Sequence, residues 1–342
     1  MNIKKTEITH REQQVLKAVV EDYILNHVPI GSNVLKQKHA FDCSSATLRN
    51  AMASLEKKNL MMHTYTSSGR VPTDVGYRYY VDHLMQQTDT LLENYNTIEK
   101  KLNISSNSVD DILQTTAAML SNISHLFGVA MILQYDRSIL NDIELLPLSS
   151  DRVMVVLGMK SGLVRSIVLN MNVAISENDI LNVTTLLKEK LLGLTLKEIQ
   201  NTIAERMQDS PLADHEIIQI LLHSPEEHFM IPDSELVFTS SNRELLDQPE
   251  YQHVENLQKT LLAIDNENVT QYFKTYLNKQ NNYMLIGNEN MEAIYNDCTI
   301  VTHVFGGSSF QGQIGILGPT RIPYANVIRI LNNFSEIMNR VC

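Results

Sequence analysis

The sequence is poor in cysteine and contains no tryptophan. Its three cysteines, Cys43, Cys298 and Cys342, are odd in number and far apart. This spacing excludes a disulfide framework of the kind found in small secreted domains, and it matches no zinc-binding pattern. We therefore expect a protein of a reducing compartment, the cytoplasm. A length of 342 residues predicts two or three domains.

A long hydrophobic run is also absent. Residues 112–135 contain no Asp, Glu, Lys or Arg, but polar side chains interrupt them and only residues 126–133 are free of such interruptions. A membrane-spanning helix needs about 20 predominantly apolar residues, so the sequence predicts no membrane association. The N-terminus likewise lacks the apolar core of a signal peptide.

The common catalytic motifs are missing as well, because there is no Walker loop, no HExxH and no CxxC. Glycines 312, 315 and 318 lie in strand-like sequence, which favours close backbone packing over a phosphate cradle. The spacing of three histidines among acidic residues does not place three metal ligands on one helix face; these are His215, His223 and His228. We expect no enzyme, no metal and no cofactor, since no nucleophile and base form a visible pair.

Positive charge is scarce overall and unevenly distributed. The net charge is −11, which at first excludes a nucleic-acid binder. Residues 1–85, however, contain 11 Lys or Arg and 8 Asp or Glu, a balance of +3, whereas the remainder has a balance of −14. Such an asymmetry indicates a basic module joined to an acidic body. An excess of three charges can also arise by chance, so the surrounding pattern has to decide.

Three short helices are predicted in the basic module. A capping box at Thr9 and Glu12 opens the first, Ser32 can cap the second, and Ser44 or Ser45 can cap the third. The third helix has small polar residues and an arginine opposite its apolar stripe, which suits insertion into the major groove of DNA. A solvated helix face is the alternative interpretation. The candidate DNA contacts on these helices are Lys36, Ser44, Ser45, Thr47, Arg49 and Asn50.

A hairpin is predicted directly after the third helix. Residues 60–65 form one strand, residues 66–69 the turn and residues 70–73 the returning strand. A hairpin at this place is typical of the wing of a winged helix-turn-helix domain. Its predicted DNA contacts are Ser67, Ser68, Gly69 and Arg70, with the hydroxyls on phosphates and the arginine in a minor groove.

Apolar and aromatic residues then recur at heptad spacing from Tyr77 to Leu102. This period favours a long helix that pairs with another helix, either across a dimer axis or against its own body. Beyond it, strands are predicted at residues 128–135, 143–148, 153–157 and 163–169, and again at 283–286, 299–305 and 311–317. Helices are predicted after Ser176 and Thr195 and at the C-terminus, and helical signals fill the region in between.

The sequence resembles the heat-inducible transcription repressors of the HrcA type. The matching segments are residues 28–32, 45–50, 66–73, 76–82, 286–290 and 315–321. Departures from the family pattern are Ser45 in place of Pro, Ala51 in place of Glu, and Ile322-Pro323 in place of Met-Asp.

The resemblance implies a multidomain α+β fold. Its expected parts are a winged helix-turn-helix DNA-binding domain at 1–85, a helical linker at 86–108, a GAF-like α+β domain at 109–199 and 277–342, and an inserted dimerising domain at 200–276. It further implies a homodimeric repressor of chaperone operons that binds double-stranded DNA at an inverted-repeat operator, with a chaperonin assisting its folding. A metabolite-sensing regulator with a ligand in the GAF-like domain is the alternative.

Overall fold

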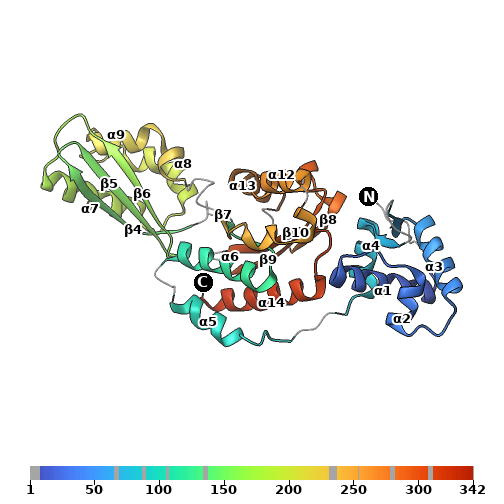
Figure 1. The fold of residues 1–342 in the computed structure, drawn as a ribbon. Helices are drawn as coiled ribbons and strands as arrows, with labels where there is room; N and C mark the ends of the chain where they lie inside the picture. The colour runs from blue at the N-terminus through green and yellow to red at the C-terminus, as the bar shows by residue number, and fades with distance from the viewer. Residues whose placement is uncertain are drawn as a thin grey trace.

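A computed structural model describes residues 8–64, 69–86, 90–104, 108–133, 138–230, 237–252, 254–277, 282–306 and 311–341. The fold is α+β. Figure 1 shows three packed units in a row: a helical N-terminal unit, a central sheet covered by helices on both faces, and a second sheet at the far end. No described helix is long and apolar enough to cross a membrane.

The N-terminal unit confirms the predicted helices and the pairing of the two hairpin strands, while residues 65–68 of the predicted turn lie outside the described residues. The Thr9 and Glu12 capping box opens the first helix, and the side chain of Ser44 caps the third. Leu16, Leu35 and Leu55 are fully buried where the helices meet. The elements are α1 (His10–Asn26), α2 (Ser32–His39), α3 (Ser45–Lys57), β1 (Met61–His63) and β2 (Arg70–Pro72), and the two strands are antiparallel.

The prediction of a long heptad helix from Tyr77 onward is wrong. The chain instead forms α4 (Asp74–Tyr79), a π-helical turn (Tyr80–Leu84) and, further on, α5 (Tyr95–Ile104). Met85 is extended, and the Leu92 amide donates to the Asn333 side chain, 3.0 Å away. The heptad residues are nevertheless buried: Tyr77 packs against Tyr324 at the start of α14 (Tyr324–Val341), and Leu92 and Ile98 belong to the same core. The extended backbone at Met85 separates the π-helical turn from α5, so the heptad pattern reports burial and not one continuous helix.

The central sheet is antiparallel throughout, with the strand order β7-β3-β10-β9-β8. Its strands are β7 (Val237–Thr239), β3 (Phe127–Leu133), β10 (Gln311–Pro319), β9 (Cys298–Gly306) and β8 (Tyr283–Ile286). Alternate residues of β3 belong to two different cores, so both faces of the sheet are covered. One face packs on α6 (Val109–Ser124) and α14 (Tyr324–Val341). The other packs on the shorter helices α11 (Arg243–Leu246), α12 (Val254–Ala263) and α13 (Asn266–Tyr272), with helical turns at Pro249–Gln252, Phe273–Leu277, Gly287–Glu289 and Ala293–Tyr295.

The regular glycines lie inside β10, as the close-packing interpretation expects. A Cβ atom on Gly312 would lie 2.2 Å from the ring of Phe305, and one on Gly318 would lie 2.8 Å from Leu126. Because these glycines lack a side chain, neighbouring side chains can pack directly against the strand. The three histidines do not assemble a metal site, since the described residues contain no group of three or more side chains that could hold an ion.

The second sheet divides the body differently from the sequence-based expectation. A separate three-stranded sheet is formed by β4 (Leu140–Ser149), β5 (Arg152–Met159) and β6 (Val164–Asn170), which the sequence-based expectation places in the GAF-like domain. It is accompanied by α7 (Glu177–Leu191), α8 (Leu196–Met207), α9 (Glu216–His223) and α10 (Pro225–His228). β7, from the segment assigned to the insert, instead pairs with β3. The boundary expected near residue 200 thus falls inside the second unit, because strand pairing sets the division.

Candidate nucleic-acid interface

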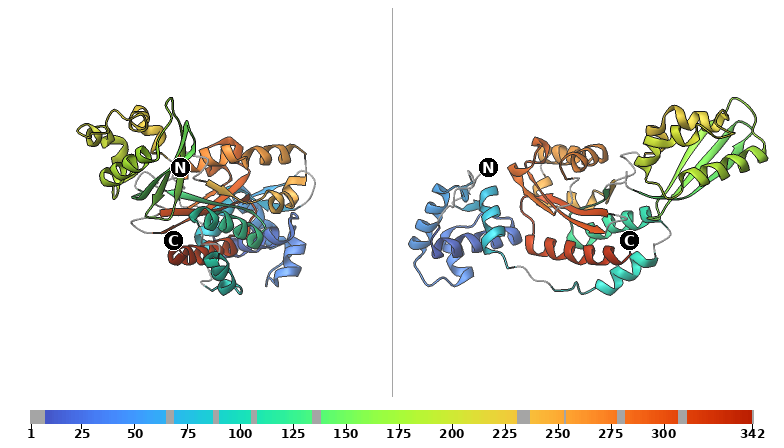
Figure 2. Two further views of the ribbon diagram at one scale, coloured as in Figure 1. Left: turned by 90° about the vertical axis from the view of Figure 1, so that its left-hand side faces the viewer. Right: turned by 180° about the vertical axis from the view of Figure 1, so that it is seen from behind.

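Helix α3 has one buried and one exposed side. Leu48, Met52 and Leu55 are buried against the rest of the N-terminal unit, while Arg49 and Asn50 are exposed. Ser45 and Thr47 are half-buried. Figure 2 shows α2 and α3 at the end of the molecule that is farthest from the second sheet. The structure thus leaves the predicted residues of these two helices wholly or partly accessible, and we call them the α3 surface (Lys36, Ser44, Ser45, Thr47, Arg49 and Asn50).

The hydroxyl groups at the start of α3 are already engaged with each other. The Ser44 side chain accepts from the Thr47 amide at 3.1 Å, and the two hydroxyl oxygens are 2.8 Å apart. This capping interaction fixes the first turn of α3 and satisfies one amide that a helix start leaves unpaired. Ser44 therefore positions the helix, and Thr47 keeps one further hydrogen-bonding direction for a ligand.

Only some of the cations of this unit are available to a ligand. Lys38 pairs with Asp22 at 2.7 Å, and Lys58 pairs with Glu12 at 2.9 Å. Lys36 and Arg49 are exposed and form no ion pair with any residue in the described part of the chain. An unpaired guanidinium can make a bidentate contact without first breaking an internal ion pair.

The hairpin differs from the predicted wing in the role of Arg70. Its Nε donates to Glu56 at 2.8 Å, its side chain is 17% exposed, and its backbone pairs with that of Ile30. Arg70 thus joins β2 to α3 and to the segment before α2 rather than extending from a hairpin tip. Gly69 is buried, and a Cβ atom there would lie 2.7 Å from Pro29. Ser67 and Ser68 lie outside the described residues.

Glu12 is an internal charge on which the N-terminal unit depends. It is 5% exposed and accepts from the Thr9 amide at 2.6 Å and from Lys58. Burial opposes its ionisation, but hydrogen bonds from Ser54, Lys58 and Thr9 outweigh burial and lower its pKa from 4.5 to about 2. Its ionised form therefore stabilises the fold above pH 4.5, and this contribution is lost as the pH falls through about 2.

We expect Glu12→Gln to lower the stability of α1 by about 2–3 kcal/mol at pH 7, because the amide can keep neither the ion pair nor the full set of accepted hydrogen bonds. Amide hydrogen exchange of α1 in the full chain measures the change. The difference from the wild type shrinks as the pH falls from 4.5 toward 2. Glu189→Gln, at an exposed position on α7, is the matched control. An unchanged α1 exchange rate in Glu12→Gln at pH 7 would contradict the prediction.

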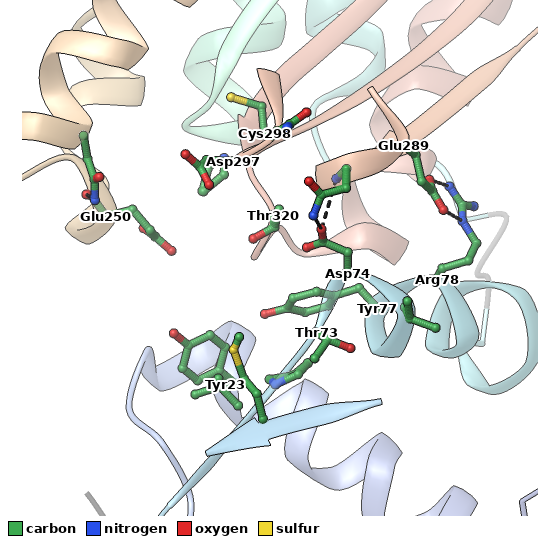
Figure 3. A pocket seen from close by; sticks show the side chains of 18 of the residues that line it. Tyr23, Thr73, Asp74, Tyr77, Arg78, Glu250, Glu289, Asp297, Cys298 and Thr320 are labelled. Carbon is green, nitrogen blue, oxygen red and sulfur yellow. Dashed lines mark hydrogen bonds and ion pairs between the residues drawn. The ribbon is translucent and has the colours of Figure 1, made fainter. Parts of the chain in front are cut away.

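Polar contacts join the N-terminal unit to the central sheet. The sequence did not predict a functional role for these residues. Asp74 accepts from the amide and side chain of Asn288 at 3.0 and 2.7 Å. Arg78 donates to Glu289 at 2.8 Å and to the Met284 carbonyl at 2.7 Å. Arg321 donates to the Ile24 carbonyl at 2.6 Å and to Glu250. Figure 3 shows the Asp74 and Arg78 contacts side by side; we call this set the junction.

A signal for the junction was present in the sequence. Residues 76–82, 286–290 and 315–321 are three of the segments on which the family resemblance rests, and each supplies a junction residue: Arg78, Glu289 and Arg321. Arg78 is more than 200 positions along the chain from Glu289 and Arg321, so the motifs alone did not show that these segments meet.

These features define a class of protein: a multidomain α+β protein whose terminal unit of three helices and a hairpin presents an exposed, cationic helix surface. A family model described as "HrcA protein C terminal domain" matches residues 110–328. Heat-inducible transcription repressors HrcA are similar over nearly the whole chain. The protein from Chlorobium phaeobacteroides strain BS1 is 32% identical, covering 96% of this chain and 97% of its own. That from Ruminiclostridium cellulolyticum is 29% identical, covering 96% of both. The chain belongs to the HrcA family.

A solved structure supports the fold independently. The crystal structure of a protein described as hypothetical, at 2.2 Å resolution, aligns with a TM-score of 0.62 at 20% identity. The alignment covers 98% of this chain and all of the other. The fold of this chain therefore also occurs in a crystal structure.

Proposed function

We propose that the protein is a sequence-specific DNA-binding repressor of heat-shock genes, acting in the cytoplasm as a homodimer on an inverted-repeat operator. The observation on which this rests is the exposed α3 surface, with Arg49 unpaired, in a chain of the HrcA family. In this proposal α2 and α3 form a helix-turn-helix, β1 and β2 form its wing, and the central sheet with its helices is a GAF-like domain.

Groove chemistry supports the role given to α3. Arg49 can donate two hydrogen bonds to guanine, and Asn50 can bond adenine through both amide atoms. A two-fold dimer presents two such helices, and its matching DNA is an inverted repeat. Selection of bound sequences from a random DNA pool tests the proposal. Enrichment of a palindrome is the expected result, and no enrichment would refute it.

The outer face of the second sheet is the surface we assign to the dimer. Leu146, Met154 and Val168 lie side by side across β4, β5 and β6, and Val164 adds to them. Leu146, Val164 and Val168 are 43–61% exposed. The heptad helix that offered another pairing surface does not form, and α5 packs on α14. Val168→Glu is expected to shift the chain toward monomer in sedimentation experiments, whereas an unchanged dimer would exclude this face.

Folding assistance by a chaperonin is part of the same proposal, because heat would then lower the amount of active repressor. Its physical support is the long-range pairing of the central sheet, in which Leu133 lies opposite Gln311. Such pairing forms late and leaves strand edges exposed during folding. A higher refolding yield with chaperonin and ATP than with albumin is the expected result.

We expect Lys36→Ala to weaken binding to all DNA sequences to a similar extent, because a lysine at this place contacts phosphate rather than bases. The slope of log affinity against log salt concentration should fall by about one unit for each half-site. A salt titration with operator and with scrambled DNA measures both effects. Lys197→Ala, exposed on α8, is the control, and an unchanged slope in Lys36→Ala would exclude the contact.

A further inference from the structure

The linker between the N-terminal unit and α5 is held against α14. Tyr77 of the N-terminal unit packs at the start of α14, and Glu99 of α5 pairs with Arg340 near its end at 3.2 Å. The linker therefore joins two parts of the molecule that lie at opposite ends of this helix, as Figure 1 shows. Within the linker, Leu92 is 7% exposed in a core that includes residues of α14, whereas its neighbour Leu91 is 61% exposed.

One side chain of α14, that of Asn333, binds the backbone of this linker. Its Oδ1 accepts from the Leu92 amide at 3.0 Å, and its Nδ2 lies 3.5 Å from the Thr90 carbonyl oxygen. Nδ2 also donates to the Arg329 carbonyl at 2.9 Å, which fixes the orientation of the amide group. Asn333 is 5% exposed, and a buried amide costs free energy unless it is hydrogen-bonded, so these contacts account for a polar residue at this place. We call Asn333 and Leu92 the linker clamp.

The linker clamp shortens the part of the linker that is free to extend. The length of a chain bounds the distance that it can span, at most about 3.3–3.6 Å for each residue. Met85 follows the last helical turn of the N-terminal unit, and the chain from Met85 to Thr90 can span at most about 18 Å. The chain from Met85 to Tyr95, where α5 begins, could span about 36 Å. While the clamp holds, an N-terminal unit that leaves the junction is therefore restricted to about half of the distance that the linker itself allows.

We propose that Asn333 and Leu92 are positioning residues for DNA binding: the linker clamp limits how far each N-terminal unit can extend from its body, and it thereby sets the largest separation of half-sites that one dimer can bind. The effect on half-sites rests on the proposed DNA-binding function. The effect on the linker does not, and it can be measured without DNA.

The first measurement is amide hydrogen exchange of the full chain without DNA. Asn333→Leu keeps a similar side-chain volume but removes the bond to the linker, so exchange of the Leu92 amide should become about tenfold faster or more. Asn332→Leu is the matched control, because the side chain of Asn332 forms no hydrogen bond with the described residues. Leu92→Ala removes the apolar part of the clamp and should accelerate the same exchange, whereas Leu91→Ala, at an exposed position, should not. Unchanged exchange in Asn333→Leu would overturn the proposal.

The second measurement compares two operators that have the same half-sites. One has the spacing found by selection, and in the other the spacing is longer by one helical turn of DNA, about 34–36 Å. We expect the wild type to bind the long operator through a single half-site. Asn333→Leu should bind the long operator about tenfold more tightly than the wild type, because both units can then reach it. On the selected operator its affinity should stay within about threefold of the wild type, because the junction still holds the units in place.

A folding defect cannot produce tighter binding, so the gain on the long operator separates positioning from stability. Tighter binding by Asn333→Leu and not by Asn332→Leu would support the proposal. Equal affinities of Asn333→Leu and the wild type for the long operator, or equal changes on both operators, would overturn it. If the wild type binds neither operator more tightly than scrambled DNA, the proposed DNA-binding function fails, and exchange of the Leu92 amide still decides whether the clamp holds the linker.

Discussion

Replacing Arg49 by Ala is expected to remove most of the preference for the operator over scrambled DNA while leaving the dimer intact. One bidentate arginine contact to guanine contributes about 1–3 kcal/mol of discrimination against a wrong base. Two copies in a symmetric dimer double this, so the specific affinity should fall at least about 30-fold. The affinity for scrambled DNA should fall only by the amount that the loss of one positive charge in each half-site causes. Competition gel shifts with both DNAs measure the two effects.

The control for this prediction is Arg11→Ala. Arg11 is also exposed and forms no ion pair with the described residues, but it lies at the start of α1 and not on α2 or α3. It removes the same charge from the same unit, so it separates recognition by α3 from general attraction to DNA. Unchanged discrimination in Arg49→Ala, or an equal loss in Arg11→Ala, would remove Arg49 from the recognition role.

Local structure was largely predictable from the sequence, because the signals that set it are local. The capping boxes at Thr9, Ser176 and Thr195 each open a helix where the sequence places them. The Lys160-Ser161-Gly162 turn joins β5 to β6, with Gly162 at a φ of 91°. These features depend on residues within one turn of one another, so a single sequence contains the information needed to find them.

The assignment of strands to sheets was not predictable in the same way. β3 and β4 follow each other closely along the chain but belong to different sheets, and β3 instead pairs with β10 and β7. Hydrophobic alternation shows that a strand has a buried side but not which strand lies beside it. The heptad pattern failed for a related reason, since Tyr77 and Ile98 are both buried as the pattern predicts, but the chain between them is extended at Met85.

The candidate site was predictable for the α3 surface and not for the hairpin or the junction. Periodicity alone separates the buried Leu48 from the exposed Arg49. Arg70 looked equally available in the sequence, but Glu56 is its partner, and nothing in the spacing of residues 56 and 70 predicts an ion pair. Whether a cation is available to DNA depends on its internal partners, and the tertiary fold determines those partners.

The junction has a predicted consequence for binding, although it does not touch the α3 surface. Two DNA-binding units can bind both halves of an operator without a large further loss of conformational entropy only if their bodies hold them at the correct spacing and orientation. Arg78 contributes to this because its side chain is 16% exposed and joins α4 to Glu289 and Met284 of the body. Arg78→Ala leaves the covalent link but removes these contacts. We expect it to weaken binding to the full inverted repeat about tenfold or more while leaving binding to a single half-site unchanged.

Fluorescence anisotropy with a full operator and with an isolated half-site measures the two affinities. A variant that exchanges the charges, Arg78→Glu with Glu289→Arg, is expected to recover part of the lost affinity for the full operator, because it restores an ion pair at the same place. It cannot recover all of it, since a carboxylate at position 78 cannot donate to the Met284 carbonyl. Equal losses on the full operator and on the half-site would show that Arg78 acts through the fold of the N-terminal unit, and the junction would then have no part in setting the spacing of the two DNA-binding units.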